Sequence, residues 1–136
     1  MPGTDPTHWL HRLSAAEWLA AADTELAQCE EALRRRAVRP GVTHARRAAG
    51  MAWNAVLVVA PDDRFGRSYM EHVVALAADE AAPDEIRAAA QALREISPAP
   101  PELITLGKPD MRALEACAAI VAHARDRVAG LQSGGS

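Results

Sequence analysis

Small apolar side chains recur at spacings of three and four residues through most of this sequence, which is the spacing of one face of an α-helix. Alanine fills many of these positions, with 31 among 136 residues, whereas aromatic residues make up only 4%. Alanine is the strongest helix former, and β-branched and aromatic side chains, which favour strands, are scarce. The sequence therefore predicts an all-α fold, an antiparallel helical bundle of four to five helices.

Local signals divide the chain into helices. Ser14 and Glu17 have the spacing of a capping box, in which each side chain satisfies a free backbone N–H of the first turn. Pro40-Gly41 separates this helix from the next. The other expected helices are 42–60, one from about 66 or 67 through Ala77, one opened by Pro83 that continues to Ile96, and one from about 110 to 129. The proline-rich segment 97–109 is expected to connect the last two.

The length suits one domain. We expect a leader over 1–13, a single helical domain over 14–130 and a flexible tail over 131–136. The sequence shows neither a secretion signal nor an apolar stretch long enough to cross a membrane, which predicts a cytoplasmic protein. The net charge of −3 argues against a general nucleic-acid coat protein but allows a local basic site.

Two cysteines, Cys29 and Cys117, lie 88 positions apart without a C-x-x-C pair. That spacing argues against a disulfide framework or a zinc knuckle, so we expect two free thiols in the core. No metal or cofactor is expected from these residues.

The segment from Asp62 to His72 is the strongest candidate for chemistry. It places Arg67 near the start of a helix and His72 five positions later. Histidine can donate or accept a proton near neutral pH, and arginine can hold a phosphate or its transition state, so this pair suits RNA cleavage. The alternative is structural: Arg67 pairs with Glu71, and His72 fills a boundary between helices.

Two further groups of residues leave alternatives open. A cluster of arginines could follow an RNA backbone or could simply form a solvated helix end, and it lacks interleaved aromatic residues for stacking bases. These arginines are Arg34, Arg35, Arg36, Arg39, Arg46 and Arg47. A metal or small-molecule site built across helices from His44 and His72 is a third, weaker interpretation. Trp53 and Asn54 could line a pocket, although tryptophan at such a position usually belongs to the core.

Part of the sequence resembles the HEPN domain, a small helical domain. The matching residues run from Glu17-Trp18-Leu19 and the helix end Glu30-Glu31-Ala32-Leu33, through His44-Ala45-Arg46-Arg47-Ala48-Ala49-Gly50-Met51-Ala52-Trp53-Asn54-Ala55-Val56-Leu57, to Arg67 and His72 with the apolar run after it. The resemblance covers roughly 60 residues.

The resemblance implies a HEPN-like bundle that forms a homodimer and, in many members, a metal-independent ribonuclease. Arg67 and His72 would then be catalytic, at a cleft between subunits, and Arg46, Arg47, His44 and Ser68 would bind the RNA substrate. Such proteins include toxins and defence components, so an antitoxin or nucleotidyltransferase partner is also implied. Val74 stands where nucleotidyltransferase-paired toxins often carry a tyrosine, so adenylylation there is not expected. The alternative implied by the same family is a non-catalytic module that binds a partner protein or a nucleotide.

Overall fold

The computed structural model describes residues 8–97 and 108–134, and within them every regular element is a helix. The elements in chain order are α1 (His8–His11), α2 (Ala15–Arg34), α3 (Val38–Val59), the 3-10 helix η1 (Asp63–Phe65), α4 (Tyr69–Ala78), α5 (Asp84–Glu95) and α6 (Arg112–Gly134). The predicted all-α bundle is therefore confirmed. Most of the expected connecting segment 97–109 lies outside the described residues.

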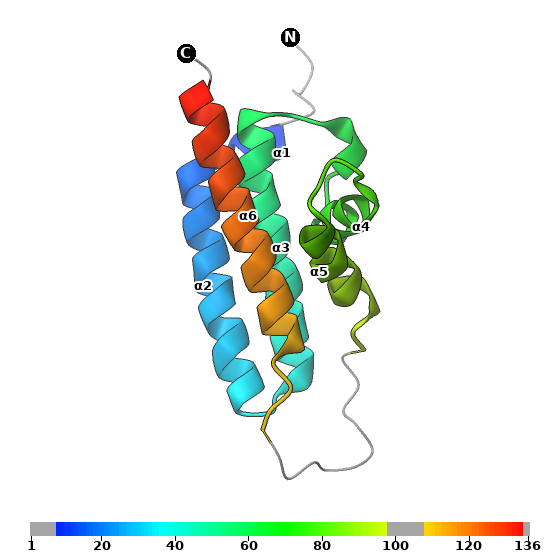
Figure 1. Cartoon of the computed structure of the whole chain (residues 1–136). Coiled ribbons are helices and arrows are strands. Elements are labelled where there is room, and N and C mark those ends of the chain that lie inside the picture. The colour runs from blue at the N-terminus through cyan, green and yellow to red at the C-terminus, as the bar shows by residue number, and fades with distance from the viewer. Residues whose placement is uncertain (1–7, 98–107, 135–136) are drawn as a thin grey trace.

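Three long helices form the body of the molecule, with α3 packed against both α2 and α6 (Figure 1). The pair α4 and α5 packs beside α3 and α6. Figure 1 shows α2 antiparallel to α3, as expected. It also shows that α6 begins at the end of the bundle where α3 begins, so these two helices run in the same direction.

Small side chains let the helices approach α3 closely. Its expected apolar face is fully buried, at Ala45, Ala48, Ala49, Ala52 and Ala55. At Gly50 there is no room for a side chain, because a Cβ built there would collide with the side chain of Tyr69 on α4. The alanine stripe read from the sequence is thus the surface on which the bundle assembles.

The second long helix begins at Val38, four residues before its expected start at Val42. The chain turns instead at Arg36, whose φ of 63° lies in the left-handed region. Pro40 is the third residue of α3, where its missing N–H costs nothing because the first turn has no acceptors for those groups. Pro40-Gly41 therefore belongs to the helix and does not separate two helices.

The expected domain limits also need revision at both ends. Within the expected leader, α1 packs on the core: Leu10 is 2% exposed, and its carbonyl oxygen accepts a hydrogen bond of 2.8 Å from Trp18 Nε1. Within the expected tail, α6 continues through Gly130 to Gly134, and Leu131 still packs against the core. No helix among the described residues has the length and apolar character to span a membrane.

Candidate functional site

His72 lies in the interior of the bundle, on the first turn of α4, and is 1% exposed. Its Nδ1 atom is 2.6 Å from the carbonyl oxygen of Phe65, and its Nε2 atom is 2.6 Å from Oδ1 of Asn54. Phe65 ends η1, and Gly66 follows it with a φ of 69°, a conformation that favours glycine. Both ring nitrogens of His72 are therefore engaged by the protein itself.

Burial lowers the pKa of His72, although the Phe65 carbonyl and the charge of Glu71 act in the opposite direction. The neutral ring carries one N–H, which Nδ1 donates to Phe65, and Nε2 is then an acceptor. The structure places Oδ1 of Asn54 at this nitrogen, so a neutral ring requires the carboxamide to be rotated and to present its amide nitrogen instead. The favoured arrangement is a neutral histidine with both nitrogens paired.

Trp9 of α1 contacts both predicted catalytic side chains. Its ring stacks on the imidazole of His72, with ring centroids 6.2 Å apart and planes at 28°. The guanidinium of Arg67 lies over the same indole, 5.6 Å from its centroid. The structure thus brings Arg67 and His72 to one tryptophan, but Arg67 is exposed while His72 is enclosed.

The guanidinium of Arg67 does not pair with the carboxylate of Glu71. The Glu71 carboxylate accepts a hydrogen bond from the backbone N–H of Ser68 at 3.2 Å, and Ser68 Oγ accepts one from the Glu71 N–H at 3.1 Å. This capping box starts α4 and lowers the pKa of Glu71. The guanidinium of Arg67 makes no hydrogen bond or ion pair with any residue that the structure describes.

A pocket of about 270 Å³ opens beside Arg67. It is lined by Trp9, Leu10, Leu57, Pro61, Asp62, Asp63, Gly66 and Arg67. These residues come from α1, the end of α3 and the loop that carries η1. The pocket therefore combines apolar walls with groups of both charges.

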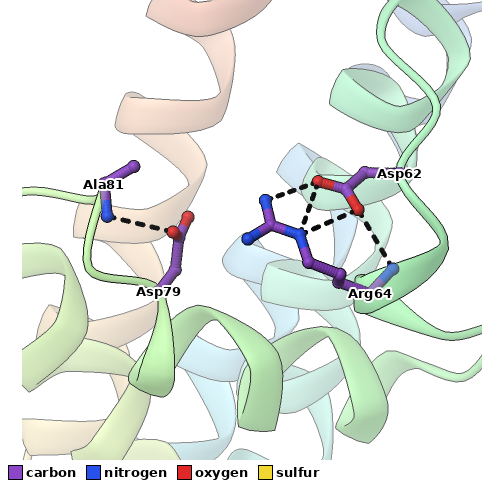
Figure 2. A network of polar contacts seen from close by, with 4 residues as sticks. All are labelled: Asp62, Arg64, Asp79 and Ala81. Atoms are coloured by element: carbon purple, nitrogen blue, oxygen red, sulfur yellow. Dashed lines mark hydrogen bonds and ion pairs between the residues drawn. The ribbon is translucent and has the colours of Figure 1, made fainter.

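The negative charge of Asp62 is paired within the loop. Its carboxylate accepts hydrogen bonds from the backbone and the guanidinium of Arg64, the shortest being 2.7 Å (Figure 2). This contact lowers the pKa of Asp62. Figure 2 also shows Arg64 directed toward Asp79, whose carboxylate caps the Ala81 N–H at 3.0 Å. The charges left free at the pocket, among the described residues, are those of Arg67 and Asp63.

The four predicted substrate-binding residues all have structural partners. Ser68 is the N-cap of α4, and Arg46 donates hydrogen bonds of 2.9 Å to the carbonyls of Leu93 and Ile96, at the end of α5. The other two, His44 and Arg47, bind the same carboxylate on α2. His44 lies ten positions before Asn54 on α3, about 15 Å along the helix, so it does not converge with Arg67 and His72.

Glu25 is the residue that joins His44 and Arg47, and the sequence analysis missed it. Its Oε2 atom is 2.5 Å from Nδ1 of His44, and its Oε1 atom is 2.8 Å from Nε of Arg47. Glu25 is buried on the apolar face of α2. A signal was available, because a glutamate inside an apolar stripe requires partners of opposite charge.

The rest of the predicted arginine cluster is bound locally or lies in solvent. Arg34 and Arg35 form ion pairs with Glu30 and Glu31, one helical turn earlier, and Arg39 is exposed. These contacts correspond to the solvated helix end that the sequence left as an alternative.

Trp53 belongs to the core, as expected for tryptophan at this position. Its ring packs against Phe65, with centroids 5.3 Å apart, and against His123 of α6, with centroids 5.9 Å apart. Burial and then the charge of Arg127 lower the pKa of His123. The indole N–H of Trp53 is buried without a hydrogen-bond partner among the described residues.

Within the described ranges, no three His, Cys, Asp or Glu side chains are grouped so that they could hold a metal ion. Comparison with protein-family models, curated proteins and solved structures finds no match to the chain. The fold is that of an all-α helical bundle.

Proposed function

We propose that this protein is a non-catalytic, HEPN-like helical module that binds a nucleotide in the pocket beside Trp9. The observation that carries the proposal is the contrast between two side chains that contact that tryptophan. Arg67 is exposed at the pocket and has no anionic partner among the described residues, whereas His72 is enclosed with both ring nitrogens paired.

The pocket offers complementary groups for each part of a mononucleotide. The Arg67 guanidinium can hold a phosphate with two parallel hydrogen bonds. The indole of Trp9 and the apolar side chains of Leu57 and Pro61 can contact the base, and the free carboxylate of Asp63 can accept hydrogen bonds from ribose hydroxyls. The pocket volume of about 270 Å³ is slightly below the usual range for small-molecule sites, so a single nucleotide is the largest ligand that we propose.

The test is a calorimetric titration of the wild-type chain with AMP, adenosine and inorganic phosphate. We expect saturable binding of AMP and at least tenfold weaker binding to Arg67→Ala, because a hydrogen-bonded charge pair is worth about 1.5–3 kcal/mol. Arg12→Ala is the matched control, since Arg12 also lies 5.6 Å from a tryptophan centroid, that of Trp18, but does not line the pocket. Absence of AMP binding, or equal loss in both variants, would overturn the proposal.

A metal-independent ribonuclease is the second candidate function. It is favoured by one observation, namely that Arg67 and His72 both contact Trp9. If the Trp9 side chain moved away, the two residues would face a common substrate. In this proposal Arg67 binds the scissile phosphate and His72 is the general acid or base. The active form is a homodimer acting on RNA, with an antitoxin or nucleotidyltransferase partner.

The ribonuclease proposal makes its own prediction for Trp9. Cleavage should increase in Trp9→Ala, which uncovers His72, and should disappear in Arg67→Ala. The nucleotide-binding proposal expects no cleavage in either variant. Both proposals fit the cytoplasmic location that the sequence predicts.

A further inference from the structure

A glutamate, a histidine and an arginine form a cluster between α2 and α3, separate from the pocket beside Trp9. Glu25 on α2 is buried, and its carboxylate contacts His44 and Arg47 on α3. The His44 side chain is 26% exposed and that of Arg47 is 49% exposed. None of the three residues lines the pocket. The cluster therefore presents two basic side chains to solvent, both held by one buried carboxylate.

Glu25 determines which nitrogen of His44 carries the hydrogen of the neutral ring. An ionised carboxylate can only accept hydrogen bonds, so the contact of 2.5 Å between Glu25 Oε2 and His44 Nδ1 requires an N–H at Nδ1. Nε2 then carries the lone pair, and it makes no hydrogen bond with the residues in 8–97 and 108–134. A carboxylate at the opposite nitrogen stabilises the positive charge that develops when such a lone pair attacks. His44 therefore has the arrangement of an oriented nucleophile.

Arg47 supplies a cation beside that nucleophile. It follows His44 by three positions, so both side chains lie on the same face of α3. Its Nε atom is 2.8 Å from Glu25 Oε1, and its two terminal nitrogens make no hydrogen bond or ion pair with a described residue. A guanidinium matches the charged oxygens of a phosphoryl group, whereas an acyl group offers only a neutral carbonyl. The two side chains together favour phosphoryl transfer over acyl transfer.

We propose that His44 is a phosphorylation site, at which Nε2 accepts a phosphoryl group from a phosphoramidate donor. The Nε2 lone pair attacks phosphorus and forms the new N–P bond, while the P–N bond of the donor breaks and its electron pair leaves with the nitrogen. That nitrogen is protonated in the donor, so a neutral amine is released. The proton on Nδ1 stays in its hydrogen bond with Glu25, whose charge offsets that of the phosphorylated ring. In total, one histidine and one phosphoramidate give one phosphohistidine and one amine.

The negative charge of Glu25 also favours this class of donor. An acyl phosphate would release a carboxylate, so a further negative charge would develop close to the buried carboxylate of Glu25 and be repelled by it. A protonated phosphoramidate releases no additional charge. The charge of the phosphoryl group itself is offset by Arg47.

The test is to treat the folded wild-type chain with phosphoramidate at neutral pH and to follow the gain of one phosphoryl group by mass spectrometry. Peptide fragmentation without exposure to acid, which hydrolyses the P–N bond, then locates the group. We expect His44 to react at least about tenfold faster than His11, which is exposed on α1 and serves as a reference within the same molecule. In denaturing urea the two rates should become similar, because the cluster is no longer assembled.

Three variants distinguish the cluster from a histidine that is only accessible. His44→Gln should lose the fast reaction. Glu25→Gln removes the charge at Nδ1, and Arg47→Ala removes the cation while leaving Glu25 and His44 in contact. Each should lower the rate at His44 relative to His11 by about tenfold, in chains shown to be folded by circular dichroism. The proposal is overturned if His44 of the folded wild type reacts no faster than His11, or if neither Glu25→Gln nor Arg47→Ala changes the ratio of the two rates.

Discussion

His72 of α4 and Asn54 of α3 meet in the interior of the bundle, with 2.6 Å between Nε2 of the histidine and Oδ1 of the asparagine. Both side chains are 1% exposed. The contact joins α3 and α4, and it occupies the ring nitrogen that faces away from the η1 loop. It therefore links the stability of the fold to the protonation state of one histidine.

Replacing Asn54 with alanine should destabilise the fold. The variant leaves Nε2 of His72 buried without a partner, which costs about 1–3 kcal/mol. Urea unfolding followed by circular dichroism measures the difference, with the exposed Gln28→Ala as the control. A loss below about 0.5 kcal/mol, the range of ordinary surface substitutions, would show that the contact contributes little.

The free energy of unfolding should decrease as the pH falls below about 6.5, the ordinary pKa of histidine. Burial lowers the pKa of His72, so in this pH range the unfolded chain binds a proton that the folded chain does not. The contribution of His72 is thus complete above the unfolded pKa and is lost as the pH approaches the lowered folded pKa.

His123 contributes to the same pH dependence, because burial and Arg127 lower its pKa as well. Urea unfolding at several pH values between about pH 8 and pH 5 gives the free energy of unfolding as a function of pH. The slope of that free energy against pH should be smaller in His72→Gln and, separately, in His123→Gln. An unchanged slope in His72→Gln would mean that His72 binds its proton equally in the folded and unfolded chains, so that burial does not lower its pKa.

Glu25→Gln should cost about 1–3 kcal/mol, because it removes the buried negative charge that holds His44 and Arg47. Glu30→Gln is the matched control. It breaks an exposed ion pair with Arg34 on the same helix, which should change the unfolding free energy by less than about 0.5 kcal/mol. Equal effects of the two substitutions would contradict the structural role of Glu25.

Alanine should have opposite effects at two glycines. Gly50→Ala places a Cβ against Tyr69 and should destabilise the packing of α3 on α4 by about 1–3 kcal/mol. Gly130→Ala meets no atom within 4 Å and should stabilise α6 by up to about 1 kcal/mol. Thermal unfolding of both variants checks the sign of each effect, and a stabilised Gly50→Ala would refute the close approach.

The sequence predicted the elements whose signals are local. The capping box at Ser14, the alanine face of α3 and the start of α5 after Pro83 all depend on residues a few positions apart, and the structure confirms them. The same kind of signal at Ser68 and Glu71 was overlooked, because Ser68 was assigned to substrate binding. Recognising that capping box would have placed the start of α4 correctly and left Arg67 without its expected partner.

The site was harder to predict because its contacts are not local. The partners of His72 and Glu25 lie 18 and 19 positions away. Periodicity shows which side of each helix is apolar, but not which polar side chains meet when the helices pack. Trp9 illustrates this most clearly, since a residue assigned to a leader covers the histidine that was expected to be catalytic.

The most direct measurement of the central claim is incubation of total RNA in EDTA with wild type, Trp9→Ala, Arg67→Ala and His72→Gln, followed by mapping of the RNA ends. Each variant is first shown to be folded by circular dichroism. A non-catalytic module predicts the same intact RNA in all four samples, while AMP binding is retained by wild type. Cleavage by wild type that increases in Trp9→Ala and is lost in both Arg67→Ala and His72→Gln would contradict the account and establish the ribonuclease.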